Sequence, residues 1–212
     1  PDNNKHLLCY SHLQDSEKLC GRIITVSGTT PTVGAETKGS VNNHYGISVD
    51  YLTDTGKFIT QYRVNNETYA RIITVSGTTV TFNTQSSKID DVTGVSPGSR
   101  GNHGVSVSYD PRSQKAIAAY LRSTGPSDGA FKWLTIDFSN NTISNIGSLE
   151  YYRGSGSGDV NVGFSNSHMQ HAFGVRQGTH ATSNIYVSRT TAFKTTNINA
   201  EGFLGLANAS YT

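Results

Sequence analysis

The sequence lacks the features of several protein classes. It contains no apolar run of about 18 residues, so it predicts no membrane span. Charged residues make up only 15% of the chain, and 17 basic against 15 acidic side chains leave a formal charge of +2. Because a nucleic-acid groove needs clustered Lys and Arg, this balance argues against a nucleic-acid partner. Glycine, serine, threonine and asparagine are abundant instead, a composition typical of secreted and virion-surface β proteins.

Cysteine and histidine are also scarce or scattered. The two cysteines, Cys9 and Cys20, fall in one predicted hairpin whose turn is centred near Gln14 and Asp15. They can then lie directly opposite each other, which makes a cross-strand disulfide geometrically possible. The alternative is that they are two small, buried apolar residues. The seven histidines form no ligand pattern, and we expect no metal site and no cofactor.

The sequence shows no helical periodicity and contains an internal repeat. Residues 71–82 (RIITVSGTTVTF) nearly repeat residues 22–33 (RIITVSGTTPTV). Each copy predicts two strands, rich in β-branched residues, that are joined by a tight turn. Gly28 and Gly77 supply the residue that takes a positive φ in that turn. A near-verbatim copy at this distance indicates a repeat architecture.

Two further strands precede each hairpin. One begins with lysine and carries an aromatic residue five positions later; these aromatic repeat positions are Tyr10, Tyr62, Tyr120 and, in an eroded fourth copy, Phe173. A short alternating strand comes before it, at residues 46–51, 104–109 and 160–164. Each complete unit is therefore predicted to contain four antiparallel strands.

The units divide the whole chain. Repeat unit 1 covers residues 1–41 and lacks its first strand, unit 2 covers 42–99, unit 3 covers 100–157 and unit 4 covers 158–201. Residues 202–212 are predicted to be a closing strand or the start of a following domain. One four-stranded sheet cannot bury both of its faces, so we predict stacked sheets in one all-β, β-propeller-like domain. A β-sandwich and a linear β-repeat array are the alternatives. Because the chain begins inside a predicted turn, we expect a fragment of a longer chain.

The repeated hairpin also suggests a family. The motif Ile-Thr-Val-Ser-Gly-Thr-Thr-Val-Thr-Phe, preceded by a Lys-x-x-x-x-Tyr strand, resembles tandem repeats of bacteriophage tail-fibre and related virion structural proteins. Residues 202–211 are similar to a segment near the C-terminal part of such proteins. The resemblance implies a structural or adhesive component of a phage tail, located at the virion surface or extracellular. Its implied partners are other virion proteins, further copies of itself and host cell-surface polysaccharide.

Candidate ligand contacts lie at the end of the third unit and the start of the fourth. Tyr151, Tyr152 and Arg153 lead into a joint rich in glycine and serine, and Asp159 is the best single acidic candidate. Aromatic rings stack on sugar faces and carboxylates bind sugar hydroxyls, so these residues are predicted glycan contacts; packing between units is the other explanation for Tyr152. We expect no enzyme. The alternatives are a glycan-cleaving propeller (a glycoside hydrolase), which needs two converging carboxylates, and an extracellular bacterial adhesin or lectin.

Overall fold

The computed structural model describes residues 4–40, 42, 44–65, 67–83, 87–91, 104–122, 128–148, 150–152, 160–165, 170–177 and 182–189. Within these ranges the chain is all-β, and every strand pairing is antiparallel. One short 3-10 turn, η1 (Leu13–Asp15), is the helical segment of this part of the chain. The prediction of an all-β fold built from antiparallel sheets is therefore confirmed.

The strands form four sheets, each made from consecutive segments of the chain. Sheet 1 contains β1 (Lys5–His12), β2 (Lys18–Ser27), β3 (Thr30–Val33) and β4 (Thr37–Lys38). Sheet 2 contains β5 (His44–Leu52), β6 (Lys57–Val64), β7 (Glu67–Ser76), β8 (Thr79–Phe82) and β9 (Ser87–Asp91). Sheet 3 contains β10 (Val105–Asp110), β11 (Lys115–Arg122), β12 (Asp128–Asp137), β13 (Thr142–Ile146) and β14 (Glu150–Tyr152). Sheet 4 contains β15 (Val160–Ser165), β16 (Gln170–Gln177) and β17 (Thr182–Arg189).

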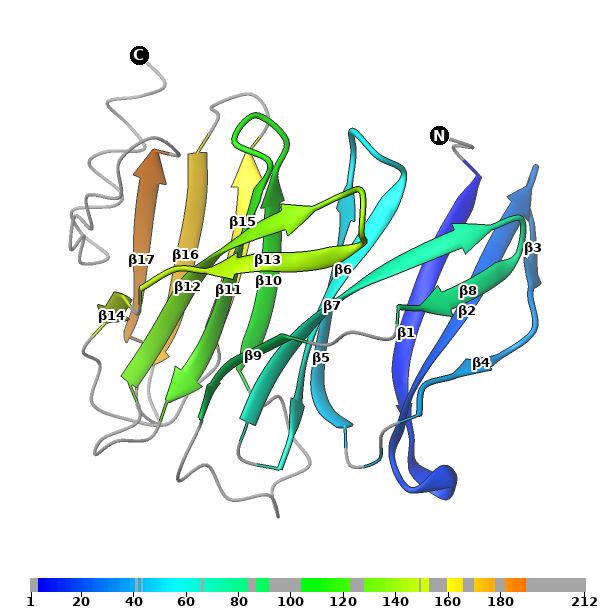
Figure 1. The fold of residues 1–212 in the computed structure, drawn as a ribbon, viewed down its shortest axis with the longest axis horizontal. Helices are drawn as coiled ribbons and strands as arrows, with labels where there is room; N and C mark the ends of the chain where they lie inside the picture. Colours follow the sequence, from blue (N-terminus) through cyan, green and yellow to red (C-terminus); the bar gives the residue numbers. More distant parts are fainter. Residues whose placement is uncertain are drawn as a thin grey trace.

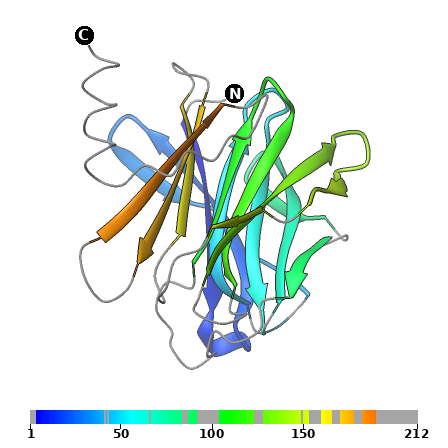
Figure 2. The same cartoon turned by 90° about the vertical axis from the view of Figure 1, so that its left-hand side faces the viewer.

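The sheets stand in a row in the order of the sequence (Figure 1), with sheet 1 at one end and sheet 4 at the other. Figure 2 shows the row from the side of sheet 4. The first strands of sheets 2, 3 and 4 lie next to one another, because β10 contacts both β5 and β15. Strands β8 and β13, at the far ends of sheets 2 and 3 from β5 and β10, run across the direction of these first strands, which reflects the strong twist of each sheet.

The repeated hairpins have the predicted turn. Ser27 pairs with Thr30 in sheet 1, and Ser76 pairs with Thr79 in sheet 2, so two residues connect the strands in each case. Gly28 and Gly77 adopt φ values of +58° and +60°. Only glycine takes this left-handed conformation at little cost, which explains why both copies place it there.

The register of the first hairpin corrects the prediction for the cysteines. Cys9 pairs with Gly21, and Cys20 pairs with Tyr10, so the two cysteines are not opposite each other and both are free. Their side chains leave opposite faces of sheet 1, since neighbouring positions on a strand alternate. The connection is a five-residue loop, with Ser16 at a positive φ of 54°, and it shifts the pairing by one residue relative to the predicted turn. Of the two alternatives for the cysteines, the structure therefore shows the unpaired one.

A fifth type of strand was missed by the sequence analysis. β4, β9 and β14 each return to the sheet and pair with the early part of β2, β7 and β12, on the same side as β3, β8 and β13. These return strands are short, at two, five and three residues, and the sequence predicts no strand at any of the three places. They matter because they carry charged side chains to the faces of the sheets.

Apolar side chains fill the space between the sheets. Ile23 of sheet 1 packs with Ile73 and Val80 of sheet 2. The largest cluster lies between sheets 2 and 3, and a third joins sheets 3 and 4 around Ile117 and Val160. Each sheet thus buries faces that it cannot bury alone. Among the described residues, no helix is long and apolar enough to span a membrane.

Candidate functional site

Equivalent serines tie the first strands of neighbouring sheets together. Ser48 Oγ of β5 accepts a hydrogen bond from the Val107 amide of β10 at 3.1 Å. Ser106 Oγ, at the corresponding position of β10, accepts one from the Val162 amide of β15 at 3.0 Å. A side-chain oxygen therefore satisfies a backbone donor of the next sheet each time. The same contact, used twice, sets the first strands side by side.

The first strands surround a polar hollow of about 350 Å³. Its lining comes mainly from residues 48–51 of β5, 106–109 of β10 and 162–164 of β15. The lining residues include serines and, at equivalent places, the aromatic residues Tyr51, Tyr109 and Phe164. Of these, Tyr109 is 3% exposed and packs in the cluster between sheets 2 and 3. Three consecutive sheets thus contribute matching residues to one surface, which we name the first-strand track.

A second hollow, of about 620 Å³, continues the track toward sheet 1. It shares Val49, Asp50 and Tyr51 with the first hollow and adds Lys5 and His6 of β1. The rings of Tyr51 and Phe58 lie 5.0 Å apart in a tilted arrangement along its lining. An aromatic pair beside charged and hydroxyl groups is a combination that binds sugars well, since rings pack on C–H faces and polar groups bind hydroxyls.

Asp50 is the carboxylate that the described lining residues contribute to both hollows. Its Oδ1 accepts from the Tyr51 amide at 2.8 Å and its Oδ2 from the Tyr109 amide at 2.7 Å. Burial raises the pKa of this carboxyl group, and the two amides oppose that shift. Since glycosidases use a pair of carboxylates, Asp50 gives the glycan-cleaving alternative no specific support.

The ligand contacts predicted from sequence lie almost entirely outside the described residues. Tyr151 and Tyr152 belong to β14, where they pair with Ala130 and Gly129 through the backbone; the structure describes nothing of their side chains. Arg153 and Asp159 lie outside the described ranges. The structure therefore does not test this predicted cluster, and the first-strand track is a separate site that the sequence analysis did not name.

The aromatic repeat positions have different surroundings in the different sheets. Tyr62 and Tyr120 are 1% and 0% exposed between sheets, whereas Tyr10 is half-buried on the face of sheet 1 that points away from sheet 2. Phe173 pairs with Val162 and Tyr186 through the backbone of β16, and its side chain is not described. In sheets 2 and 3 another sheet covers the face that carries the repeat tyrosine, whereas in sheet 1 no other sheet of the described residues covers the corresponding face.

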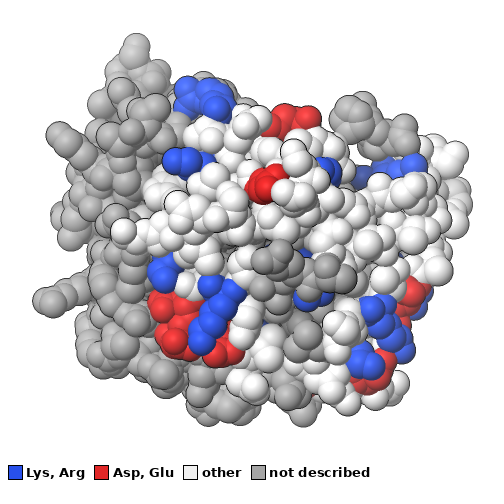
Figure 3. All heavy atoms as spheres, viewed as in Figure 1, with Lys and Arg blue, Asp and Glu red and all other residues white. Residues whose placement is uncertain are grey.

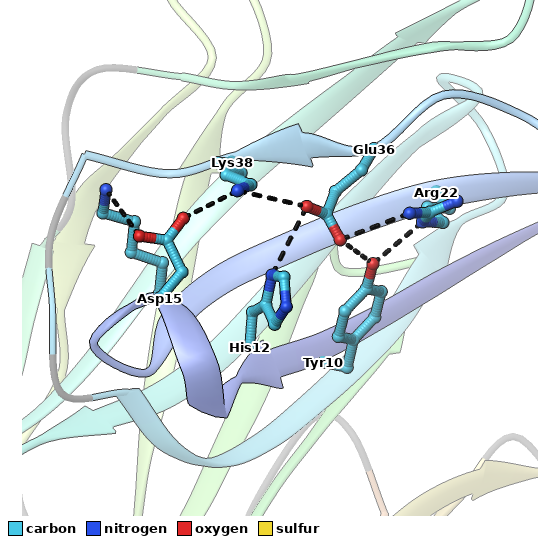
Figure 4. A network of polar contacts seen from close by, with 7 residues as sticks. Tyr10, His12, Asp15, Arg22, Glu36 and Lys38 are labelled. Atoms are coloured by element: carbon cyan, nitrogen blue, oxygen red, sulfur yellow. Dashed lines mark hydrogen bonds and ion pairs between the residues drawn. The ribbon is translucent and has the colours of Figure 1, made fainter.

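A polar network occupies this outer face (Figure 4), and we name it the end network. At its centre is Glu36, whose Oε2 accepts a hydrogen bond from the Tyr10 hydroxyl. Arg22 donates from Nε to the Tyr10 oxygen at 2.9 Å, and its Nη2 lies 3.5 Å from Glu36 Oε2. The other carboxylate oxygen, Oε1, faces His12 Nδ1 at 3.4 Å and Lys38 Nζ at 3.6 Å. Lys38 also pairs with Asp15 at 2.8 Å.

The electrostatics of the end network follow from these contacts. The hydrogen bond from Tyr10 and the surrounding cations lower the pKa of Glu36, so its carboxylate stays ionised. Beneath it lies Cys20, which is 0% exposed, and burial raises the pKa of its thiol. One ring nitrogen of His12, Cys20 Sγ and a Glu36 oxygen all lie within 4.8 Å of one another. Sequence reasoning missed this group because Glu36 lies between predicted strands and has no counterpart in the repeated motif.

The charged residues elsewhere are dispersed. The face shown in Figure 3 is mostly uncharged, and its Lys, Arg, Asp and Glu side chains gather in small groups of mixed sign. Among the described ion pairs, Lys88 contacts both Glu67 and Asp91. On this face the described residues form no extended patch of one sign. Comparison with known proteins found no family model that matches the chain and no matching curated protein.

Proposed function

We propose that this chain is a structural and adhesive β-repeat protein that presents the first-strand track to a glycan. The observation that carries the proposal is the convergence of equivalent residues from β5, β10 and β15 on one polar, aromatic surface. A repeating ligand such as a polysaccharide fits a surface that repeats sheet by sheet. Tyr51 and Phe58 offer ring faces, and Lys5, His6 and Asp50 add polar groups to the same lining.

We further propose a propeller-like arrangement of the sheets. Contact between the first strands, repeated from β5 to β10 to β15, favours a fan whose first strands lie near an axis. In such a fan the first-strand track faces the centre, where propellers commonly have a channel. A β-sandwich has two sheets, so it does not explain a contact that recurs across three. A linear array would also repeat this contact and remains the alternative arrangement of the sheets.

The setting at a virion surface is proposed from the sequence repeat alone. Tail-fibre proteins, which the repeats resemble, combine a structural and an adhesive role, and a surface with few charges suits contact with neutral sugars. Self-association or assembly with other virion proteins belongs to this proposal. Immunogold labelling of phage particles with an antibody raised against the purified chain tests the setting separately from the binding.

A glycan-binding measurement tests the adhesive role. Immobilised bacterial surface polysaccharides are exposed to the purified chain, and the expected result is saturable binding to at least one of them. Tyr51→Ala removes the ring that lies beside Phe58 in the larger hollow and is expected to weaken that binding about tenfold, as loss of one stacked ring typically does. Tyr10→Ala is the matched control, since Tyr10 lies on the outer face of sheet 1 and lines neither hollow. Equal binding by the wild type and Tyr51→Ala contradicts the proposed site.

A further inference from the structure

Three metal-ligating side chains converge on the outer face of sheet 1. They are His12 of β1, Cys20 of β2 and Glu36, which directly precedes β4. Their donor atoms lie within 4.8 Å of one another, a separation that a small inward movement converts to the spacing of ligands around one ion. We propose that His12 Nδ1, Cys20 Sγ and Glu36 Oε1 bind a zinc ion, with a water molecule as the fourth ligand.

The types of donor atom in this cluster favour zinc over other common divalent metals. Thiolate, imidazole and carboxylate together are ligands of Zn²⁺, whereas Mg²⁺ and Ca²⁺ prefer oxygen alone. Three protein ligands also leave one tetrahedral position for water. The ion would join β1, β2 and the segment before β4, so its binding energy would stabilise sheet 1 directly.

The orientation of Glu36 is already that of a metal ligand. Its Oε2 is held by the Tyr10 hydroxyl and lies near Arg22, while its Oε1 points to His12. Carboxylate ligands commonly have one oxygen fixed by neighbouring hydrogen bonds in this way, which orients the other toward the metal. Tyr10 and Arg22 would therefore be positioning residues for the site (Figure 4).

The other two donors are also available. His12 Nδ1 is buried and makes no hydrogen bond, although Glu36 Oε1 lies 3.4 Å from it. The Cys20 thiol is fully buried beneath the network, so the sulfur would reach the ion from the interior side of the site. On binding, the S–H bond breaks, a sulfur–zinc bond forms and the proton leaves to solvent. No oxidation or reduction takes place.

Lys38 competes with the ion. Its Nζ lies 3.6 Å from Glu36 Oε1 and has a second partner, Asp15 Oδ2, at 2.8 Å. Lys38 can therefore retain the contact with Asp15 when an ion takes its place beside Glu36. Lys38→Gln removes this competing positive charge, and we expect it to tighten zinc binding about tenfold.

Titration of the reduced 212-residue chain with Co²⁺ and with Zn²⁺ tests the proposal. We expect one equivalent of Co²⁺ to produce a thiolate-to-cobalt charge-transfer band. Zn²⁺ at about 100 times its dissociation constant should raise the melting temperature by about 5–10 °C. Cys20→Ala should lose both effects. Cys9→Ala is the matched control and should keep them, because Cys9 packs against sheet 2 on the opposite face.

A second variant keeps the test decisive if Cys20→Ala does not fold. His12 has a side chain that is 34% exposed, so His12→Gln is expected to fold and to bind zinc at least tenfold more weakly. The proposal is overturned if the charge-transfer band is absent in the wild type, if Cys20→Ala retains it or if Cys9→Ala loses it. It is also overturned if His12→Gln binds zinc as tightly as the wild type.

Discussion

The face between sheets 2 and 3 and the open face of sheet 1 use the same repeat positions in different ways. Between the sheets, the Tyr120 hydroxyl donates to Asp90 Oδ2 at 2.9 Å. Lys132 donates from Nζ to the Ile89 carbonyl at 2.7 Å, and it lies 3.9 Å from Asp90. Both partners belong to β9, the return strand of the neighbouring sheet. The tyrosine and the cation of sheet 3 are thus satisfied by sheet 2.

On the open face, the equivalent pair finds its partner within its own sheet. Tyr10 and Arg22 both contact Glu36, which precedes the return strand β4. The comparison shows that the repeat places a tyrosine beside a cation, and that in sheets 1 and 3 this pair contacts a carboxylate. The carboxylate comes from the neighbouring sheet in sheet 3 and from the same sheet in sheet 1. In sheet 2 the equivalent pair is a cation–π contact, with the Arg71 guanidinium 5.8 Å from the Tyr62 ring. Apolar side chains pack around the covered pair, whereas the open pair is exposed to solvent on one side.

The largest expected difference between the two faces comes from removing the tyrosine rings. Tyr120→Ala leaves a cavity among fully buried residues and should lower the free energy of unfolding by about 3–5 kcal/mol. Tyr10→Ala, at the equivalent but half-buried position, should cost about 1 kcal/mol. Urea unfolding of both variants measures the difference. Equal losses would show that the open face is packed as tightly as the covered one.

The sequence predicted part of this arrangement. β-branched residues and the Ser-Gly turn defined the hairpins, because a tight turn and alternating strands have local signatures. The spacing of lysine and tyrosine also identified Tyr10, Tyr62 and Tyr120 as equivalent positions. No local signature marks β9 or Asp90, since a short polar return strand looks like a loop in sequence.

The candidate sites were harder to predict for the same reason. The first-strand track depends on which sheets become neighbours, and hydrogen bonds such as Ser48 to Val107 join residues far apart in the chain. The end network depends on a register that differs by one residue from the predicted one. In a strand, a shift of one residue moves a side chain to the other face, so Cys20 could not be assigned to its partners from spacing alone.

A change of pH should separate a covered face from the open one. His171 is 1% exposed between sheets 3 and 4, where its ring lies 5.5 Å from Trp133 and 4.9 Å from Phe164. Burial lowers its pKa from 6.5 to about 4, against the opposing charge of Asp110. The unfolded chain therefore binds the proton first as the pH falls. His171 contributes stability above pH 6.5 that is lost between pH 6.5 and pH 4, about 3 kcal/mol in total.

Unfolding free energies measured across this range test the contribution of His171. His171→Phe should remove its part of the pH dependence. Glu36→Gln is the control from the open face. The pKa of Glu36 is lowered in the folded protein, so its carboxylate stabilises the fold above pH 4.5, the unfolded value. This stabilisation is lost only as the pH falls below 4.5. A wild-type stability that stays constant from pH 6.5 to pH 4, or a slope that persists in His171→Phe, would contradict the assignment.

The smallest expected difference lies in the two copies of the repeated turn. Gly28 and Gly77 have nearly the same φ, and an added Cβ would meet nothing within 4 Å at either position. Gly77→Val should therefore act through backbone strain and cost about 1–2 kcal/mol. Gly28→Val introduces the same strain, but β3 is exposed throughout, whereas Val80 of β8 is 1% exposed in the core.

An exposed strand can separate locally without unpacking the sheets, so the strain at Gly28 should be relieved at a global cost below about 1 kcal/mol. Urea unfolding of the two valine variants gives the global costs, and hydrogen exchange of β3 and β8 shows where the strain is released. Faster exchange confined to β3 is expected for Gly28→Val. An unchanged stability in Gly77→Val would mean that the turn tolerates a β-branched residue and does not fix the register of β7 and β8. Equal losses in the two variants would mean that β3, despite its exposure, is held as firmly as β8.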